Sequence, residues 1–572
     1  MIQKILRAGC FWVLLLNVSY SSAQVFNAKN YPKGYFTWPV LATRALAANF
    51  GELRPNHYHM GFDCKTDKKQ NLPVLAAADG YIAKIKIESY GFGRAIYINH
   101  PNGLTTLYAH LNDFFPELEA YVKEQQYQLK SWAVSLDIPT ALFPVKKGMF
   151  IAYSGNTGGS QGPHLHFEIR DTKTDKVLNP SLFGFPIPDN VPPTVLKLAV
   201  YDRCTSTYEQ NPKFYPLKKV NGVYVTVPAS IMVNTDKVSF AIAAYDTYTG
   251  SGNRNGIYEA VLYDNEAPVV GFQIDSIGYD ETRYLNAHID YKLRSSGGPF
   301  VEHLSKLPGY YNSIYKSFSG DGVIALEDTT MHTIKILVRD AYGNTSTVQF
   351  GVKRANTVTP KDKTMPPAAY RQKEFQPGFI NVFENSNISF YLPENALYDS
   401  IRFRYSELAA ADGSTIYQLH NVNVPVHTYF TVKIKGGAAA NGKMVMHRFA
   451  NGKDDYAKAE FENGWYKASF REFGNFQLME DVMPPDIAPV GFKDGMNCSK
   501  LNRIAFVIKD NTEEIKNFEA ILDGNWLRFT NDKGRTFAYV FDEKCAPGEH
   551  ELKITATDQV GNVTEKVFHF TR

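Results

Sequence analysis

The sequence predicts a mainly β protein, in which an antiparallel-sheet domain with a helical insertion precedes immunoglobulin-like β-sandwich domains. Three observations support this fold class. The 572-residue chain contains 35 Tyr and 38 Phe, an aromatic content that suits β-sheets. Short segments of alternating apolar and polar residues recur along it. Two segments also share a repeat that ends in an Asp-x-x-Gly-Asn turn.

Chain length and net charge indicate how many domains to expect and which kinds of partner to disfavour. Because single cores usually stop growing before about 300 residues, a chain of 572 residues should contain several domains. The formal net charge is only +3. This balance gives no reason to expect nucleic acid or an anionic membrane surface as a partner.

The first 23 residues have the pattern of a secretory signal peptide. Lys4 and Arg7 form a positive start, residues 10–16 form a short apolar core, and residues 21–23 form a small-residue cleavage site. The apolar run is shorter than the roughly 20 residues that a membrane span needs, which disfavours an anchoring helix. The sequence therefore predicts export, to the periplasm, the cell envelope or the medium, and no transmembrane span.

Residues 24–190 are predicted to form the antiparallel-sheet domain. Strands are expected at residues 81–85, 95–98 and 104–108. The sequence Pro101-Asn102-Gly103 between the last two strands is typical of a hairpin turn. His100, beside this turn, is expected to be a surface residue.

One segment of this domain has helical periodicity. Apolar residues recur at three- and four-residue intervals between Glu117 and Leu136. Pro116 precedes this segment, and Glu117 and Glu119 place negative charge where a helix dipole favours it. We expect a helical insertion over about residues 114–137. It would either form a wall or lid of a substrate groove or add packing that never meets substrate.

The two repeated segments are predicted β-sandwich domains at residues 191–353 and 482–572. Their matching parts are Tyr258–Leu262 with Phe518–Leu522, and Asp340–Asn344 with Asp558–Asn562. The second pair resembles the last hairpin of bacterial immunoglobulin-like domains. The Asp residues are expected to form turns rather than to bind calcium, because no run of closely spaced carboxylates is present.

The region between the repeats divides into a linker and a further β-rich domain. Residues 354–378 are rich in Lys, Thr and Pro and are the predicted linker. Residues 379–481 are β-patterned, with strands expected at 388–392 and 466–470. The β domains could bring the protein to a cell surface or a protein partner, or could serve as spacers.

Four cysteines follow the predicted signal peptide, namely Cys64, Cys204, Cys498 and Cys545. Cys498 and Cys545 lie in one predicted domain. These two residues could form a disulfide, as exported proteins can, or remain two buried thiols, and the sequence does not decide between these alternatives. Cys64 is expected to be a small buried residue and not a metal ligand.

Three short motifs in the first third of the chain carry the candidate chemistry. They are His59-Met60-Gly61-Phe62-Asp63, Tyr108-Ala109-His110 and Gly162-Pro163-His164-Leu165-His166. Together they supply three candidate metal ligands and two further imidazoles. That set is typical of a catalytic zinc site, which keeps one coordination position open for water.

Strand geometry assigns two roles to the final pair of histidines. His164 and His166 begin a strand, so their side chains point to the same face. One can bind a metal ion while the other reaches a metal-bound water. His59 and Asp63 would be about 13 Å apart on a straight strand, so the chain must bend between them, and Gly61 permits a bend. His57 is a rival to His59, because the two also form a His-x-His pair.

At these residues the chain resembles the lysostaphin-type (LytM-like) zinc metallopeptidases, which cut peptides in bacterial peptidoglycan. The resemblance runs from about Phe50 to Pro180 and rests on the His59 to Asp63 motif, Leu75–Gly80, Tyr108–Leu111, Ser154–Gly158 and Gly162–Glu168. It implies one Zn²⁺ held by His59, Asp63 and His166. It also implies catalytic imidazoles at His110 and His164, and peptidoglycan peptides as the partner.

Two features depart from the family pattern. The helical segment is an insertion relative to minimal members. No residue clearly matches the tyrosine that some relatives use to support the oxyanion, although Tyr58 and Arg54 are candidates.

The function expected from this set is zinc-dependent hydrolysis of peptide bonds in peptidoglycan stem peptides or cross-links by an exported endopeptidase. His164 or His110 would deprotonate the attacking water, and the sequence leaves open which of them does so. Two alternatives stand beside this reading. One is a non-catalytic wall-binding scaffold or activator of other hydrolases, and the other is an exported protease that acts on non-wall proteins.

Overall fold

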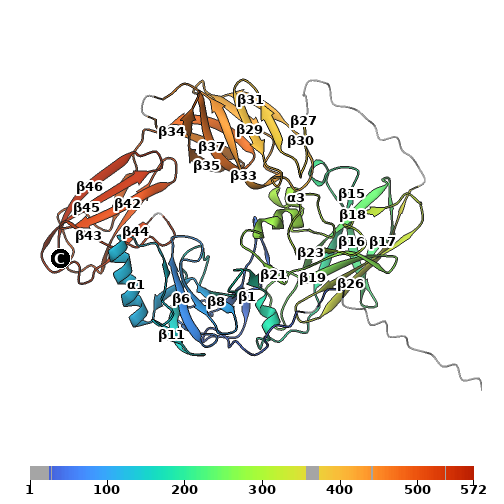
Figure 1. The fold of residues 1–572 in the computed structure, drawn as a ribbon, viewed down its shortest axis with the longest axis horizontal. Coiled ribbons are helices and arrows are strands. Elements are labelled where there is room, and N and C mark those ends of the chain that lie inside the picture. Colours follow the sequence, from blue (N-terminus) through green and yellow to red (C-terminus); the bar gives the residue numbers. More distant parts are fainter. Residues whose placement is uncertain (1–24, 28, 356–372, 440–441, 535) are drawn as a thin grey trace, which may run out of the picture. The chain divides into compact units, whose positions relative to one another are not determined.

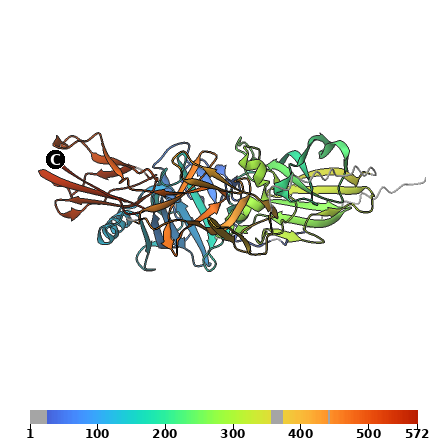
Figure 2. The ribbon, with the colours of Figure 1, turned by 90° about the horizontal axis from the view of Figure 1, so that it is seen from above.

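The computed structural model describes residues 25–27, 29–355, 373–439, 442–534 and 536–572. The predicted signal peptide lies outside these residues. Residues 356–372 of the predicted linker also lie outside them. Residues 32–572 belong to one compact unit. Strands make up most of the secondary structure (Figure 1, Figure 2), which confirms the mainly β prediction.

The first domain is built on an antiparallel sheet with the strand order β1-β4-β13-β8-β7-β6-β10. The bounds of these strands are β1 Leu46–Ala48, β4 Phe62–Lys65, β13 His164–Asp171, β8 Leu104–Ala109, β7 Arg94–Asn99, β6 Gly80–Ile87 and β10 Val134–Asp137. The three predicted strands lie within β6, β7 and β8. A smaller sheet has the order β5-β12-β9, with bounds Pro73–Leu75, Phe150–Ser154 and Leu111–Phe114.

The turn between β7 and β8 forms where the sequence predicts it. Gly103 has a φ of 79°, a left-handed conformation that favours glycine at a tight turn. His100, however, is not a surface residue. The residue is 6% exposed, and its ring has Nδ1 2.8 Å from the Asp79 carbonyl and Nε2 2.8 Å from Thr106 Oγ1. Hydrogen bonding on both sides accounts for the burial of a polar ring at a hairpin.

The helical insertion is shorter than the sequence predicts. Helix α1 spans Pro116–Leu129 and ends at Lys130, whose φ of 47° lies in the left-handed region. Residues 134–137 form strand β10 and pair with β6. The apolar spacing beyond Leu129 also fits a strand, and the free edge of β6 supplies backbone partners for it. The prediction of helix over about 114–137 is therefore wrong for residues 130–137.

The next region, to Arg354, holds a long sheet with the order β22-β18-β15-β16-β17-β26-β25-β19-β20-β23. In that order the strands span Glu302–His303, Lys237–Tyr245, Thr194–Asp202, Lys213–Val220, Val223–Val233, Thr345–Arg354, His332–Arg339, Glu259–Asp264, Ala267–Gln273 and Tyr315–Ser317. The β17/β26 pair is parallel, and the other pairs in this order are antiparallel. Short helices α2 and α3 span Leu285–His288 and Tyr291–Ser295.

Two pairs of larger sheets follow, together with the two-stranded sheet β27-β30, formed by Lys373–Phe375 and Ile401–Phe403. The first pair has the orders β28-β29-β33-β37-β36 and β31-β32-β38-β34-β35. These strands span, in order, Asn381–Glu384, Ile388–Leu392, Pro425–Lys435, Trp465–Glu472 and Glu460–Glu462, and then Tyr405–Ala409, Thr415–Leu419, Gly474–Glu480, Met444–Ala450 and Lys453–Lys458. Both strands predicted in this segment are present, in β29 and β37.

The last pair has the orders β39-β41-β44 and β40-β46-β45-β42-β43. These strands span Asp486–Val490, Arg503–Lys509 and Thr536–Val540, and then Met496–Asn497, Val563–Thr571, Glu549–Asp558, Ile515–Leu522 and Asn525–Trp526. Cys498 and Cys545 are buried here as free thiols, and the other two described cysteines, Cys64 and Cys204, are also free.

The first domain and the sheet that follows it share one hydrophobic core. Phe50, Tyr58 and Met60 belong to the same buried cluster as Phe272 and Ile277 of the next region. Burial of apolar surface is the main stabilising term in folding. The two regions are thus joined by packing as well as by the chain.

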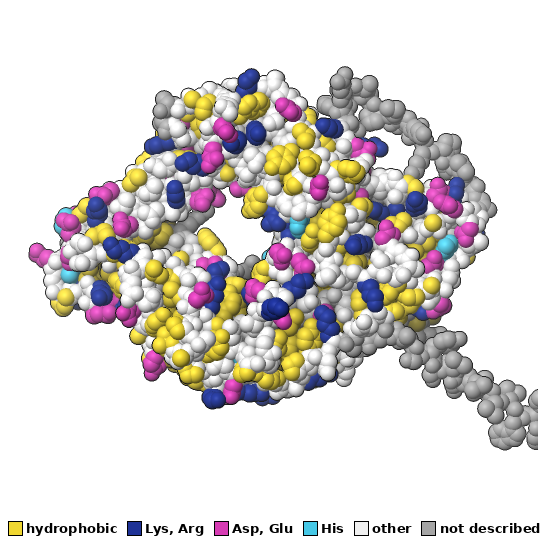
Figure 3. Space-filling view, in the orientation of Figure 1, with side chains coloured by type: hydrophobic (Ala, Val, Ile, Leu, Met, Phe, Trp, Pro, Cys, Tyr) yellow, Lys and Arg dark blue, Asp and Glu magenta, His cyan; other side chains and the backbone are white. Residues whose placement is uncertain are grey.

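The surface agrees with the small net charge. On the face shown in Figure 3, basic and acidic side chains are interspersed. Among the described residues, no helix combines the length and the apolarity that crossing a membrane requires.

Candidate metal centre

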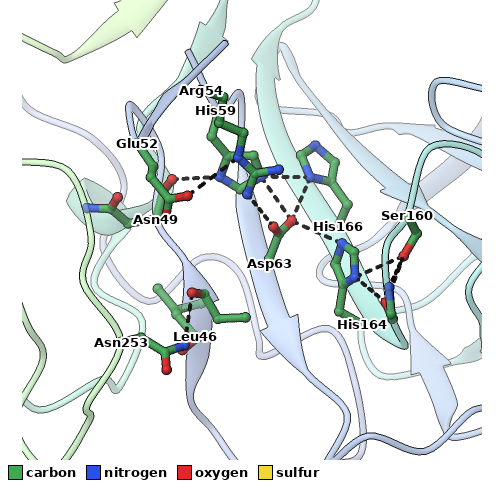
Figure 4. A network of polar contacts seen from close by, with 12 residues as sticks. Leu46, Asn49, Glu52, Arg54, His59, Asp63, Ser160, His164, His166 and Asn253 are labelled. Carbon is green, nitrogen blue, oxygen red and sulfur yellow. Dashed lines mark hydrogen bonds and ion pairs between the residues drawn. The ribbon is translucent and has the colours of Figure 1, made fainter. Parts of the chain in front are cut away.

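Strand pairing places Asp63 beside His166. The two residues face each other across β4 and β13, and β8 flanks β13 on its other edge. Asp63 Oδ1 lies 2.9 Å from His59 Nε2 and 3.0 Å from His166 Nδ1 (Figure 4). The two ring nitrogens are 3.1 Å apart. The structure therefore brings together the three residues that the sequence predicts as metal ligands.

Gly61 allows this convergence, although for a different reason than a bend. A Cβ atom at Gly61 would lie 2.5 Å from the Phe167 carbonyl oxygen and 3.1 Å from His166 Cε1. Its φ is not in the left-handed region, in contrast to many other glycines of the chain. The position needs a residue without a side chain because β13 runs against it.

The outer nitrogens of the two ligand histidines are held by acceptors. His59 Nδ1 donates to the Asn49 carbonyl at 2.7 Å, and His166 Nε2 donates to Glu168 Oε1 at 3.0 Å. These bonds place the protons on the outer nitrogens. When the two rings are neutral, His59 Nε2 and His166 Nδ1 therefore present lone pairs toward Asp63 Oδ1, an arrangement that a cation would stabilise. Two imidazoles and a carboxylate are a donor set that fits Zn²⁺.

Burial and the neighbouring polar groups act in opposite directions on the pKa values of these residues. Burial acts to lower the pKa of His166, but hydrogen bonds with Asp63 and Glu168 and their charges raise it to about 9. Burial lowers the pKa of His59 despite the nearby Asp63 carboxylate. For Asp63, burial acts to raise the pKa, but His59 and the hydrogen bonds from His164 and His166 hold it well below its usual range.

Glu168 orients His166 and was not predicted as a site residue. It is fully buried, and its Oε2 accepts from Arg170 Nε at 2.7 Å while its Oε1 accepts from Tyr279 Oη at 2.5 Å. Burial acts to raise its pKa, but Arg170, His166 and Tyr279 lower it to about 2. The alternation of β13 places Glu168 on the same face as His166, so the strand pattern could have indicated it. Tyr279 comes from the next region of the chain, and no local signal points to it.

His110 and His164 lie together beside the three ligand candidates. Their ring centroids are 4.8 Å apart, and the His110 centroid is 5.9 Å from that of His166. His110 adopts a φ of 59°, rare for a residue with a side chain, and its Nδ1 donates to the Thr157 carbonyl at 2.8 Å. Burial, followed by the charges of His166 and His164, lowers the pKa of His110 to about 3.

His164 is oriented by its own loop. Its Nδ1 donates to the Gly162 carbonyl at 2.8 Å and lies 3.2 Å from Ser160 Oγ. Its Nε2 therefore points toward the centre, 3.3 Å from Asp63 Oδ1. Both predicted catalytic imidazoles thus hold Nδ1 against a backbone carbonyl and leave Nε2 for other contacts.

All five predicted residues line one cleft of about 1100 Å³. Its other walls come from Glu52, Arg54, Phe92, the Gly159–Pro163 loop and Tyr279. Within the described part of the chain, no residue of 116–137 lines this cleft. Helix α1 instead contacts the last region, where Lys123 Nζ lies 2.7 Å from Asp542 Oδ2 and Arg528 Nη1 donates to Gln126 Oε1 at 2.9 Å.

The remaining candidates Arg54, Tyr58 and His57 all line this cleft, but their side chains differ in environment. Arg54 Nη2 lies 2.8 Å from Asp63 Oδ2 and lines the cleft. Tyr58 is fully buried, with its ring 5.7 Å from that of His288, so its side chain belongs to the core. His57 is exposed, and its Nδ1 lies 2.8 Å from the Pro55 carbonyl. Cys64 is fully buried and is not among the metal-ligand candidates.

Comparison with known proteins agrees with this geometry. Residues 57–127 match Peptidase family M23, and residues 373–481 match the Zu5-like domain. The first region of the chain is a Peptidase family M23 domain. Its predicted resemblance to lysostaphin-type peptidases is thereby confirmed.

Three curated relatives share this M23 domain. DD-carboxypeptidase/endopeptidase Mpg of Neisseria meningitidis serogroup B is 30% identical over 206 residues, 36% of this chain and 36% of Mpg. Glycyl-glycine endopeptidase ALE-1 of Staphylococcus capitis is 28% identical over 252 residues, 43% of this chain and 57% of ALE-1. Lysostaphin of Staphylococcus simulans is 27% identical over 233 residues, 40% and 38% of the two chains. The chain spans about a third of Mpg's length.

Proposed function

We propose that this protein is an exported zinc-dependent endopeptidase that hydrolyses peptide bonds in peptidoglycan stem peptides or cross-links. The observation that carries the proposal is the convergence of His59 Nε2, His166 Nδ1 and Asp63 Oδ1 within 3.1 Å of one another. Two further imidazoles, His110 and His164, stand at the same centre. This is the full complement of groups that metal-assisted peptide hydrolysis requires.

Zinc held by His59, Asp63 and His166 would supply a Lewis acid that lowers the pKa of water to about 7. Two acceptors in the chain fix which ring nitrogen of each ligand histidine carries the proton. Glu168 keeps the proton of His166 on Nε2, and the Asn49 carbonyl keeps that of His59 on Nδ1. Both inner nitrogens are therefore free to act as ligands.

His110 and His164 carry the proton transfers. A neutral His110, anchored through Nδ1 to the Thr157 carbonyl, can accept a proton at Nε2. His164, anchored through Nδ1 to Gly162, has the same capacity at Nε2. One of them would take the proton of the attacking water, and the other would stabilise negative charge on the carbonyl oxygen when its Nε2 carries a proton to donate to that oxygen. Return of the proton to the leaving amine completes hydrolysis.

The substrate class rests on the relatives and on the predicted export. Mpg is named a DD-carboxypeptidase/endopeptidase, and ALE-1 is named a glycyl-glycine endopeptidase. The signal-like pattern of residues 1–23 would place the enzyme in the compartment that holds peptidoglycan. The β domains that follow would hold the enzyme at a surface or a protein partner.

The test is incubation of the zinc-loaded full chain with purified peptidoglycan, followed by mass analysis of the released fragments. We expect new amine and carboxyl termini within the stem peptides or cross-links, lost on chelation and restored by zinc. Casein in a parallel reaction separates this function from an exported protease of broad specificity. Retention on peptidoglycan without release of any fragment would instead support a wall-binding scaffold and contradict the proposal.

A further inference from the structure

Outside the M23 domain, the fold assembles the same group of three aspartates twice. Asp189, Asp246 and Asp340 form one group, and Asp481, Asp510 and Asp558 form the other. In each group, carboxylate oxygens from all three residues lie within 4.8 Å of one another. We call these groups the first and the second triad.

The two triads occupy equivalent positions in the two repeats. Asp189 and Asp481 each stand three residues before a Pro-Pro pair at the start of a repeat. Asp246 follows β18 and Asp510 follows β41, and Asp340 and Asp558 stand where β25 and β45 end. The sequence disfavoured calcium because no closely spaced run of carboxylates exists. Strand pairing removes that objection by bringing three separate segments together.

The first triad contains buried oxygens that accept no hydrogen bond. Asp246 is 2% exposed, and neither its Oδ1 nor Asp189 Oδ2 has a donor among the described residues. The Asp340 carboxylate, by contrast, accepts from the amides of Tyr342 and Asn344 at 2.8 and 2.9 Å. A buried carboxylate oxygen without a donor is strongly unfavourable, and a cation placed between Asp189 and Asp246 would satisfy both.

The second triad repeats this arrangement. Asp481 is 2% exposed, and its Oδ2 and Asp510 Oδ1 have no donor in the described part of the chain. Asp558 accepts from the amides of Val560 and Asn562, both at 2.9 Å. The same pattern of satisfied and unsatisfied oxygens therefore occurs once in each repeat.

No basic side chain neutralises the first triad. Among the described residues, neither Lys nor Arg forms an ion pair with Asp189, Asp246 or Asp340. Burial, with the charges of Asp340 and Asp189, raises the pKa of Asp246 to about 7. The second triad differs, because Lys443 Nζ donates to Asn562 Oδ1 at 2.5 Å beside Asp558.

We propose that each triad binds one calcium ion. The donors are all oxygens, without His or Cys, which excludes the chemistry that zinc prefers. Three carboxylates from separate segments suit the six to eight flexible ligands of Ca²⁺ better than the strict octahedron of Mg²⁺. The first triad binds more tightly, since the Lys443 ammonium repels a cation at the second.

Calcium at these positions ties the start of each repeat to its last hairpin. Asn344 Nδ2 already donates to the Asp189 carbonyl at 3.4 Å, and Asn562 Nδ2 donates to the Asp481 carbonyl at 3.0 Å. The ion would reinforce these weak links between the entering segment and the Asp-x-x-Gly-Asn turn. It would thus fix how each repeat joins the segment before it.

The test is isothermal titration of the full chain with calcium chloride after a chelating resin has removed bound metal. We expect two equivalents of calcium and a melting temperature higher by at least about 3 °C at saturation. Asp246→Asn should remove the tighter site and Asp510→Asn the weaker one. Asp264→Asn, which changes a carboxylate at the end of β19 outside the triad, is the matched control and should keep both.

Two further measurements make the result decisive. Asp63→Asn should lose zinc yet keep both calcium equivalents, which separates the triads from the M23 centre. In the unaltered chain, calcium should slow amide hydrogen exchange at residues 340–344 and 558–562, a readout that does not depend on any variant folding. Absence of calcium binding at millimolar concentration, or binding that survives the Asp246→Asn and Asp510→Asn pair together, would overturn the proposal.

Discussion

Asp63 is the residue on which the M23 centre depends. One of its oxygens contacts His59, His166 and His164 at 2.9, 3.0 and 3.3 Å. Its other oxygen lies 2.8 Å from Arg54 Nη2. The ligand candidates and the catalytic candidates therefore meet at a single buried carboxylate, and changes on its two sides should have different consequences.

His166→Ala and His110→Ala should separate metal binding from turnover. The first change removes a ligand nitrogen, so the variant should lose both zinc and activity. The second leaves His59, Asp63 and His166 intact, so zinc content should stay near one equivalent while turnover falls about 10²- to 10⁴-fold. Zinc analysis of the purified variants and the rate of peptide release measure the two effects. Full activity of the His110 variant would contradict its role.

Glu168→Gln should weaken zinc binding without removing a ligand. The amide cannot provide the negative charge that holds His166 Nε2–H and balances Arg170. Loss of such an outer contact typically costs 10- to 100-fold in metal affinity, so we expect a zinc dissociation constant raised by about that factor. Competition with a coloured chelator measures it.

Tyr279→Phe is the milder companion of that variant. It removes only one hydrogen bond to Glu168, and the Arg170 contact remains. We expect its zinc affinity to fall by less than about tenfold. Equal effects of the Glu168 and Tyr279 variants would argue against a charge-based role for Glu168.

The sequence predicts the role of a site residue best when that role depends on residues close to it in the chain. The spacing of His164 and His166 predicts a shared face, and the structure shows both rings at one centre. Asn49 and Thr157 hold the histidines through backbone carbonyls, which every residue possesses, so no residue type reveals them. Tyr279 reaches the site only through tertiary packing.

At the scale of elements, the tight pairing of β4 with β13 positions the ligands. Gly61 lies where any side chain would collide with the Phe167 carbonyl of β13. The close pairing of β4 with β13 therefore depends on the absence of a side chain at Gly61 as well as on the hydrogen bonds between the strands.

Gly61→Ala tests this element directly. The added methyl group must push β4 from β13, so we expect the free energy of unfolding to fall by about 1–3 kcal/mol and zinc affinity to fall with it. Gly162→Ala is the matched control, because a Cβ there has nothing within 4 Å. Chemical denaturation of both variants provides the comparison, and equal stability of the two would refute the close-approach explanation.

Helix α1 shows where element prediction fails. Its start agrees with Pro116 and the acidic residues of the first turn. Its end does not, because the apolar residues near 132–136 fit a helix and a strand equally well. The edge of β6 favours the strand, because it offers backbone hydrogen-bond partners to residues 134–137. That edge exists only once the sheet has assembled.

At the scale of the whole molecule, the M23 domain and the following sheet share a core. Tyr58, Met60 and Val177 pack with residues of β18, β20 and β25. The sequence pattern predicts the mainly β class and the repeat, because both depend on the local alternation of apolar and polar residues and on the residue types at turns. It could not predict this shared core, because an apolar residue does not specify which domain covers it.

The shared core predicts joint folding. A fragment of residues 24–190 would expose Tyr58, Met60 and Val177, so it should be poorly soluble or should melt well below the full chain. A fragment of residues 24–355 keeps the core and should unfold in one calorimetric transition that zinc moves upward. A soluble 24–190 fragment with the stability of the longer one would show that the two regions fold independently.

The most direct test of the zinc peptidase account compares His59→Ala with His57→Ala. The two histidines are two residues apart, yet one faces Asp63 and the other is exposed. We predict that the His59 variant loses bound zinc and releases no peptides from purified peptidoglycan, whereas the His57 variant keeps one zinc and most of the activity. Peptide release by the His59 variant at the unaltered rate, or loss of zinc from the His57 variant alone, would contradict the account.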